Sequence, residues 1–388
     1  MFDLKIFVIL LCWKVTKGDV YDIPEESTCE WRNATGKCVH ARRCYSFQYD
    51  RMENRHPPIC SFEGKEPIIC CTDCVIGDIN HRVKDVLDTD HYKTDRKYLK
   101  KCYEYKVTLP YACKTHVSHT YKLEWKESKK CYDFTHGGLA PVGGEDALRG
   151  DYPHMALLGY GPDLETAEWL CGGSLISERF ILTAGHCASS TQLGAVTYVA
   201  LGMLKRSDPP HFWKRYKIKR FIPHPDYHPP LKYNDIALIE TEISINFTDG
   251  VRPACLTHKP EIRGDDLAYA TGWGSLGPHK ENADVMQKVF LQKFSPEECA
   301  RQYPVYRHLP QGHNETTQVC YGDHNKVRDT CRGDSGGPLQ KRDPDARYCQ
   351  YAVIGVTSYG HECGAPGSAG VYTRVYHYLP WIENIVWP

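Results

Sequence analysis

The sequence predicts an all-β protein whose larger, C-terminal part ends in one helix and follows a small module held together by disulfides. From Val142 onward, short apolar runs such as Met155–Leu158 and Val353–Val356 alternate with breaks of Gly, Pro and Asp. This pattern is typical of a β-barrel or β-sandwich. Helical periodicity is absent there until Tyr376–Val386, which we expect to form a closing helix. Six cysteines fall within residues 28–72, and so short a segment needs cross-links to be stable.

The bulk composition limits the partners and the compartment. The 388 residues include 48 basic and 48 acidic side chains, so the formal net charge is zero. This balance gives no electrostatic reason for binding nucleic acid or a membrane, and we expect neither as a partner. The chain has 19 cysteines, which indicates an oxidising compartment.

The first residues resemble a secretory signal peptide. Lys5 precedes the apolar run Ile6–Trp13, and the small Gly18 ends the stretch, so we expect residues 1–18 to be removed. Removal takes Cys12 with it and leaves 18 of the 19 cysteines, an even number that fits nine disulfides. We therefore expect a secreted, extracellular protein. In such a protein three sequons are candidate glycosylation sites: Asn33, Asn246 and Asn314.

The N-terminal cysteines form a knot whose pairing the spacing does not decide. Six cysteines allow fifteen pairings, and the adjacent Cys70 and Cys71 are poorly placed to bond to each other. A six-cysteine knot that ends in Cys-Cys, before a linker and a second domain, resembles the clip domain of arthropod haemolymph proteases. The resemblance implies a clip domain over residues 28–72 with the disulfides Cys29–Cys70, Cys38–Cys60 and Cys44–Cys71. Such a module is either a docking module or only a folding cap.

Residues 73–140 are expected to be a linker, or light-chain segment. Within it Asp85–Lys101 is expected to be partly helical. It contains four cysteines, which indicates that it is tethered: Cys74, Cys102, Cys113 and Cys131.

Three islands in the second half contain residues suited to nucleophilic catalysis. His186 follows the apolar stretch Ile181–Thr183, Asp235 opens another apolar run, and Ser335 lies in the Gly-rich segment Asp329–Leu339. Each island alone has an ordinary structural explanation. Their order, His then Asp then Ser, is that of the chymotrypsin and trypsin family. Over residues 141–388 the chain resembles that family in further stretches as well: Cys171–Ser174, Thr271–Gly274 and Gly370–Arg374.

The resemblance implies a chymotrypsin-like double β-barrel and a role for each site residue. Ser335 is the nucleophile, His186 the general base, and Asp235 the group that orients the imidazole. The N–H groups of Gly333 and Ser335 form the oxyanion hole. Substrate specificity falls to Asp329, a buried carboxylate that favours Arg or Lys, with Gly360 and Gly370 as pocket walls.

The same resemblance implies the remaining disulfides. Three bridges belong to the protease domain: Cys171–Cys187, Cys299–Cys320 and Cys331–Cys363. A fourth, Cys131–Cys255, would hold the light chain. Four cysteines are then left with three possible pairings, of which we favour Cys102–Cys349 and Cys74–Cys113.

The activation stretch departs from the family. A cut before Ile-Val-Gly-Gly normally releases an ammonium group that pairs with the acid next to the nucleophile, here Asp334. The matching stretch, Leu139–Gly144, offers Pro141 as the new terminus, and no Arg or Lys precedes it. Three explanations stay open: an unusual or shifted cut, a zymogen that never fully activates and serves as a scaffold, or a sequence variant.

Smaller departures concern neighbouring positions. Gly185 stands where Ala is usual before the histidine, and we expect little consequence. Thr330 stands where Ser is commoner and favours Arg over Lys. The family's calcium loop matches Gly202–Tyr216, where Asp208 is the only acid, so we expect no metal and no cofactor.

The sequence thus predicts a secreted serine endopeptidase zymogen that resembles the snake-like branch of clip-domain proteases. It would cut after Arg or Lys in a haemolymph cascade of melanisation, Toll-pathway immunity or development. The implied partners are a downstream protease zymogen as protein substrate, an upstream activating protease and a serpin inhibitor. The alternative is a catalytically silent adaptor or cofactor. A digestive or venom trypsin is disfavoured, because digestion needs no clip-like knot or linker.

Overall fold

The computed structural model describes residues 23–25, 27–31, 34–41, 44, 47, 56–72, 74–75, 95–107, 112–113, 144–147, 149–248, 250–259, 267–277, 280–324, 333–342, 351–361 and 367–388. The chain divides into two compact units. One comprises Met1–Lys84 and Thr108–Ser128, and the other Asp85–Val107 and Lys129–Pro388. In these described segments no helix combines the length and the apolar character that crossing a membrane requires.

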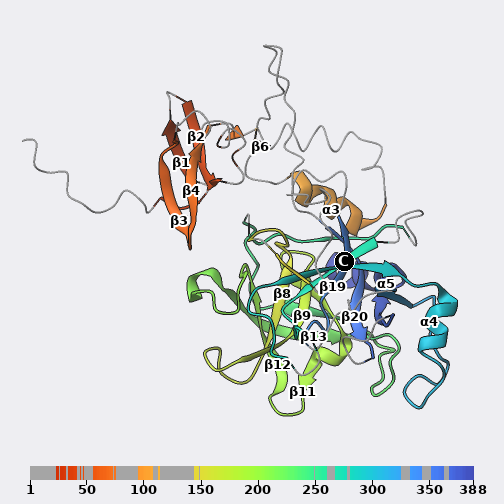
Figure 1. Cartoon of the computed structure of the whole chain (residues 1–388). Coiled ribbons are helices and arrows are strands. Elements are labelled where there is room, and N and C mark those ends of the chain that lie inside the picture. Colours follow the sequence, from red (N-terminus) through yellow and green to blue (C-terminus); the bar gives the residue numbers. More distant parts are fainter. Residues whose placement is uncertain are drawn as a thin grey trace, which may run out of the picture. The chain divides into compact units, whose positions relative to one another are not determined.

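The first unit contains a four-stranded antiparallel sheet in the order β1-β2-β4-β3 (Figure 1). Its strands are β1 (Thr28–Trp31), β2 (Ala34–His40), β3 (Ile59–Glu63) and β4 (Glu66–Cys71). The core is small: beside the cysteines its buried apolar residues are Val39, Ile68 and Ile69, too little apolar surface to hold the sheet without cross-links.

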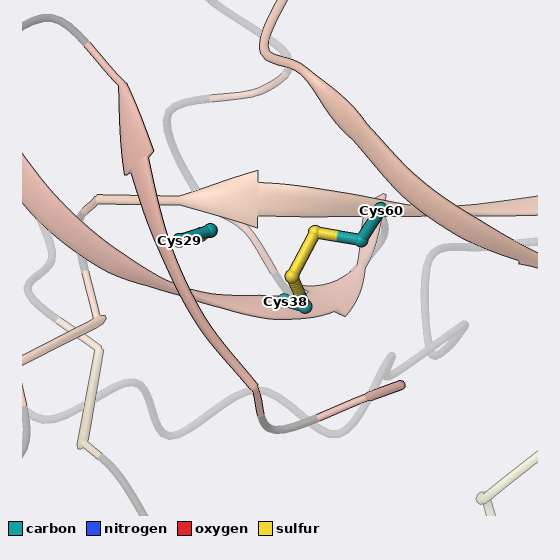
Figure 2. A group of neighbouring side chains, drawn as sticks. All are labelled: Cys29, Cys38 and Cys60. Carbon is teal, nitrogen blue, oxygen red and sulfur yellow. A yellow bond between two sulfur atoms is a disulfide. The ribbon is translucent and has the colours of Figure 1, made fainter. Parts of the chain in front are cut away.

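Three disulfides hold this sheet together. They are Cys29–Cys70, Cys38–Cys60 and Cys44–Cys71, so the pairing implied by the clip-domain resemblance is confirmed. Figure 2 shows the bond between Cys38 and Cys60, with Cys29 beside it. The sulfur atoms of these three residues lie within 4.8 Å of one another, but each is already bonded to another sulfur, so none is a thiolate that could bind a metal.

Two short strands accompany the sheet. β5 (Cys74–Val75) pairs with β6 (Ala112–Cys113), and Cys74 stands opposite Cys113 in the register. The expected disulfide between these two cysteines agrees with this register and stays a prediction.

The second unit begins its β-structure with a closed six-stranded barrel. The strands run β12-β13-β14-β10-β9-β8, and β8 pairs back with β12. Their bounds are β8 (Met155–Tyr160), β9 (Glu168–Leu175), β10 (Phe180–Thr183), β12 (Gly194–Leu201), β13 (Lys214–Pro223) and β14 (Ala237–Thr241). The short β11 (Ser189–Ser190) extends the edge at β12. β8, β10 and β14 are buried on both faces, which explains their unbroken apolar runs.

A second closed barrel follows in the order β20-β19-β16-β17-β18-β21, with β21 pairing back to β20. Its strands are β16 (Leu267–Gly272), β17 (Gln287–Lys293), β18 (Gln318–Gly322), β19 (Pro338–Arg342), β20 (Tyr351–Tyr359) and β21 (Ala369–Arg374). Two short strands join its edges: β7 (Glu145–Asp146) pairs with β17, and β15 (Cys255–Leu256) runs parallel to β20. The all-β double-barrel prediction is confirmed.

Helices close the unit at its ends. α5 (Val375–Val386) is the predicted C-terminal helix, and it buries Val375, Tyr378, Leu379, Ile382 and Val386, a spacing that puts all five on one face. α4 (Pro296–Gln302) begins with a capping box between Ser295 and Glu298. Two short 3-10 helices, η3 (Gly185–Ala188) and η4 (Pro210–Phe212), complete the elements described here.

α3 (Lys97–Val107) lies in the segment that was expected to be a linker. The expectation that Asp85–Lys101 is partly helical is confirmed for Lys97–Lys101, and α3 continues beyond that stretch to Val107. Residues 85–94 lie outside the described residues. Tyr98, Cys102 and Tyr105 are buried and recur every three or four residues, so they share one helix face. The Tyr105 hydroxyl donates to Glu178 at 2.8 Å, and α3 thereby packs on the barrels as part of the same unit.

Candidate active site

His186 and Asp235 form the central pair of the site. His186 lies in η3, directly after buried β10, and Asp235 precedes β14, the neighbour of β10 in the sheet. The His186 Nδ1 atom lies 2.8 Å from Asp235 Oδ2, and the backbone N–H of His186 donates to Oδ1 at 2.9 Å. With a carboxylate accepting at Nδ1, the neutral imidazole presents the lone pair of Nε2. The pair can therefore take up a proton.

Asp235 is enclosed by polar groups that favour its charged form. It is 3 % exposed, and the Ser358 hydroxyl on β20 donates to its Oδ2 at 2.5 Å. Burial raises the pKa of Asp235, but the charge and hydrogen bonds of His186 and the hydroxyl of Ser358 outweigh it and hold that pKa below its usual value. The Thr373 hydroxyl on β21 donates to the Asp235 carbonyl at 2.8 Å. η3 and β20 thus hold Asp235 through its carboxylate, and β21 holds it through its backbone carbonyl.

Asn234 positions the turn that leads into Asp235. Its φ is +54°, a left-handed conformation that Asn tolerates better than most residues. Its side chain accepts from the Tyr378 hydroxyl at 2.8 Å and donates to the Asp226 carbonyl at 3.0 Å. α5 therefore helps to hold the site through Tyr378.

Ser335 sits on a tight turn that packs against the histidine segment. Gly333 and Gly336 have φ of +97° and +76°, which only glycine adopts easily. The Ser335 carbonyl accepts from the N–H of Gly172 at 2.8 Å and lies 3.7 Å from the Cys187 sulfur. Cys187 is the residue after His186, so the turn of Ser335 and η3 lie against each other. The structure thus brings His186, Asp235 and Ser335 together from separate islands.

Asp334 points to the other side of this turn, into a space that glycines leave open. The N–H of Gly274 donates to its Oδ1 at 2.9 Å. A Cβ atom on Gly272 or Gly274 would collide with this carboxylate. The Gly-Trp-Gly sequence therefore has a geometric reason, and Trp273 between the glycines is 1 % exposed and donates to the Leu204 carbonyl.

Gly185 has a neighbour that the sequence did not suggest. A Cβ on Gly185 would lie 2.6 Å from the Tyr227 ring, so alanine at this position would require that ring to move. The expectation that glycine here has little consequence stays a prediction. Burial, and next the charge of Asp235, raise the pKa of Tyr227 to about 12, which indicates that the ring lies close to the central pair. Tyr227, Ser358, Thr373 and Asn234 are site residues that sequence reasoning missed, because each belongs to an ordinary loop or strand.

Gly360 and Gly370 lie next to each other across two strands. Tyr359 pairs with Val371 in the register of β20 and β21, so Gly360 and Gly370 flank this pair. Other predicted residues fall outside the described part of the chain: Asp329, Thr330, Cys331, Cys363, Pro141, Asn33, Cys131 and Cys349.

Two further disulfides have the predicted pairing, and one observed bond overturns two predicted pairings. Cys171–Cys187 and Cys299–Cys320 are formed as predicted. Cys255 bonds to Cys102 and not to Cys131, so Cys131–Cys255 and Cys102–Cys349 were both wrong. Cys102 is the partner of Cys255 because it lies on the buried face of α3. This helix packs beside β15, the strand that begins at Cys255.

The loop that matches the family's calcium site is held by an ion pair. The Asp208 carboxylate accepts from Arg149 at 2.7 and 2.8 Å and from the N–H groups of Leu204 and Lys205 at 2.8 and 2.9 Å. Burial raises the pKa of Asp208, but Arg149 and the backbone donors outweigh it and lower that pKa. The guanidinium of Arg149, which lies outside this loop in the sequence, therefore pairs with the loop's carboxylate.

Comparison with known proteins agrees with this geometry. The profile of the trypsin family matches residues 141–382. "Serine protease snk" of Drosophila melanogaster is 33% identical over 356 residues, which cover 90% of this chain and 76% of that protein. "Venom serine protease Bi-VSP" of Bombus ignitus is 32% identical over 362 residues, covering 89% and 88%. "Melanization protease 1" of Drosophila melanogaster is 34% identical over 267 residues, covering 63% and 65%. The chain therefore belongs to the trypsin family of serine proteases, with its resemblance to the clip-domain proteases of insects.

Proposed function

We propose that the chain is a secreted zymogen of a serine endopeptidase that cleaves after Arg or Lys in a haemolymph cascade. The single observation that carries this proposal is the convergence of the His186–Asp235 pair and the Ser335 turn. Family membership supports the protease role. The specificity, the zymogen state and the cascade are our inference.

The proposed mechanism uses each site residue in turn. Ser335 Oγ attacks the scissile carbonyl while His186 Nε2 takes its proton, and His186 later protonates the leaving amine. Asp235 keeps the proton of the neutral imidazole on Nδ1 and stabilises the imidazolium. The N–H groups of Gly333 and Ser335 receive the oxyanion, and the loss of one such donor typically costs about 3–4 kcal/mol of transition-state stabilisation.

Specificity is proposed to reside in Asp329, with open walls at Gly360 and Gly370. A carboxylate at the base of a narrow pocket needs a cation to compensate for its lost hydration, which favours Arg or Lys. Thr330 favours Arg over Lys. Replacing Asp329 by Ser is expected to lower kcat/KM on Arg-amide substrates by about 10³-fold or more, with kinetics on small neutral substrates as the control.

Asp334 is the proposed switch of the zymogen. The Asp334 carboxylate lies against Gly272 and Gly274. This position supports a role in which a new N-terminal ammonium group near Pro141 forms a buried ion pair with the Asp334 carboxylate. Pro141 and the missing basic residue before it favour a shifted cut or an activating protease of unusual specificity.

The decisive experiment is activation with a defined control. The purified zymogen and its Ser335→Ala variant are incubated with haemolymph proteases, the new N-terminus is sequenced, and both are assayed on Arg-amide substrates. We expect Arg-amide cleavage only with intact Ser335. Cleavage that survives the alanine would overturn the mechanism, and preference for aromatic or small residues would overturn the specificity.

One observation favours a second candidate, a catalytically silent adaptor or cofactor. It is the atypical stretch around Pro141, which lacks a basic residue at the expected cut. A correctly cut chain that binds substrate-like inhibitors but hydrolyses nothing would support the adaptor over the enzyme.

The proposed surroundings follow from the relatives. One of them is named a melanization protease, and we infer a comparable extracellular setting with a protease zymogen as substrate, an upstream activating protease and a serpin inhibitor. We further propose glycans at Asn33, Asn246 and Asn314. Asn246 is exposed, and Asn314 Oδ1 accepts from the N–H of Thr316 at 3.0 Å, in a local turn at the surface.

A further inference from the structure

A cleft of about 990 Å³ opens on the protease unit, away from the residues of the proposed triad. Its walls come from the start of α3, the end of β17, α4, β18 and α5. None of its lining residues is His186, Asp235 or Ser335. We call it the basic cleft and define it by Arg96, Lys293, Phe294, Arg374 and Leu379.

Most of the permanently charged side chains that line the basic cleft are cationic. Arg96, Lys293 and Arg374 contribute permanent positive charges, and Glu315 is the one carboxylate among the described residues that line it. The Arg96 side chain is 58% exposed, and its guanidinium is oriented by Glu383 at 3.6 Å. Such a surface attracts anions through the solvent before they make contact.

Histidines add hydrogen-bonding groups to these charges. His258, His313 and His377 line the same cleft. Burial and next the positive charge of Arg374 lower the pKa of His313 to about 4, so its ring is neutral at physiological pH. The buried Nε2 of His313 has no hydrogen-bond partner among the described groups, whereas a neutral imidazole normally satisfies both nitrogens when it is buried.

Apolar side chains interrupt the cations and decide the ligand class. Phe294, Val319 and Leu379 form the buried floor of the cleft, and the ring of Tyr376 is 37% exposed at its wall. A sulfated polysaccharide has no apolar groups for these surfaces, whereas a polypeptide offers carboxylates and apolar side chains on the same segment.

The basic cleft is connected to the site through one strand. Arg374, in the wall of the cleft, directly follows Thr373, whose hydroxyl donates to the Asp235 carbonyl. The Arg374 guanidinium in turn donates to the Gln318 carbonyl at 3.4 Å. An occupant of the cleft would therefore lie against the strand that bonds to the backbone of Asp235.

We propose that the basic cleft binds an acidic segment of a partner polypeptide, with carboxylates on Arg96 and Lys293 and an apolar side chain against the ring of Tyr376. The cleft is thus a surface that recruits the partner at a place separate from the proposed active site. Binding does not depend on catalysis, so it can be tested with an inactive chain.

The test measures binding to the full chain carrying Ser335→Ala. The probe is a fluorescent synthetic peptide of about twelve residues in which pairs of Glu alternate with Phe and Leu. We expect saturable binding by anisotropy, and a loss of affinity of about tenfold or more for each of Arg96→Glu and Lys293→Glu. Lys217→Glu is the matched control, since Lys217 lies on β13 with a side chain 64% exposed, and its affinity is expected to stay unchanged.

Two altered probes separate the sources of affinity. A peptide with Gln for Glu and a peptide with Ser for Phe and Leu are both expected to bind more weakly. The proposal is overturned if Arg96→Glu and Lys293→Glu bind as the parent does, or if Lys217→Glu weakens binding equally. It is also overturned if heparin binds in the cleft and the acidic peptide does not.

Discussion

Asp235 is the residue on which the polar contacts of the site converge. His186, Ser358 and Thr373 all bond to it, and its carboxylate is almost fully buried. A buried carboxylate stays ionised only while its donors stay in place. We expect Asp235→Asn to lower kcat by about 10³-fold or more without unfolding the protein, because the imidazole loses its fixed tautomer. Kinetics on an Arg-amide substrate and circular dichroism check both parts, and near-normal kcat in the folded variant would contradict the proposed role.

Gly185 gives a second test at the scale of single residues. Alanine here would place its Cβ 2.6 Å from the Tyr227 ring, so the ring must move. We expect Gly185→Ala to reduce the free energy of unfolding by about 1–3 kcal/mol. Urea denaturation measures this value. With Tyr227→Ala as background the same change is expected to cost much less, and an equal cost in both backgrounds would show that the ring is not the cause.

These two residues mark how far sequence reasoning reaches within the site. His186, Asp235 and Ser335 were predictable because each lies in a short, distinctive stretch. Ser358 and Tyr227 were not, because a serine on a strand and a tyrosine in a loop have no local signature. Their importance arises from contacts across more than forty positions of the chain, which no local pattern encodes.

At the scale of elements, α3 is the feature whose extent the sequence predicted only in part. The predicted helix was located by its charged residues, whereas the observed one is set by the buried Tyr98, Cys102 and Tyr105. The packing of α3 against β15 also decides the partner of Cys255. Spacing alone could not choose between Cys102 and Cys131, and the family resemblance had favoured Cys131. By contrast, the strands and α5 were predictable because their apolar patterns are strong and local.

The disulfide between α3 and β15 can be tested directly. We expect non-reducing peptide mapping by mass spectrometry to join the peptide of Cys102 to that of Cys255. The double variant Cys102→Ser, Cys255→Ser is expected to lose about 2–5 kcal/mol of unfolding free energy, because the bond closes a loop with a sequence separation of 153 residues. A Cys131–Cys255 peptide in the map would restore the sequence-based pairing.

The loop around Asp208 offers a comparison of two ion pairs. Arg149 and Asp208 have side chains 14% and 6% exposed, so removing one partner leaves a buried charge. We expect Arg149→Met to cost about 3–5 kcal/mol. The matched control is Arg215→Met, because Glu165, the partner of Arg215, is 72% exposed, and its loss should cost less than about 1 kcal/mol. Equal costs would contradict the structural role assigned to Asp208.

At the scale of the whole molecule, a buried histidine links stability to pH. His154 is 1% exposed, and burial lowers its pKa from 6.5 to about 4. The unfolded chain therefore binds a proton between these values that the folded chain does not, so stability falls as the pH drops below 6.5. Between about pH 7.5 and about pH 5 this residue alone is expected to remove about 2 kcal/mol.

The variant His154→Phe isolates this contribution. It keeps an aromatic ring beside Tyr152 and Tyr351 but cannot take up a proton. Urea denaturation at the two pH values should therefore show a smaller difference for the variant than for the parent. An unchanged difference would mean that His154 is not a source of the acid sensitivity.

The bond between Cys102 and Cys255 decides whether the two parts of the proposed active enzyme stay together. Cys102 precedes residue 141 and Cys255 follows it, so a cut at that position would yield two chains that remain one covalently linked molecule. Dilution into a body fluid could not then separate the clip module from the protease unit. A partner bound to that module would stay at an effective concentration of about millimolar for the enzyme that carries it. Binding of that partner to the protease unit would then depend on the length of the connecting chain and no longer on the concentration of the enzyme.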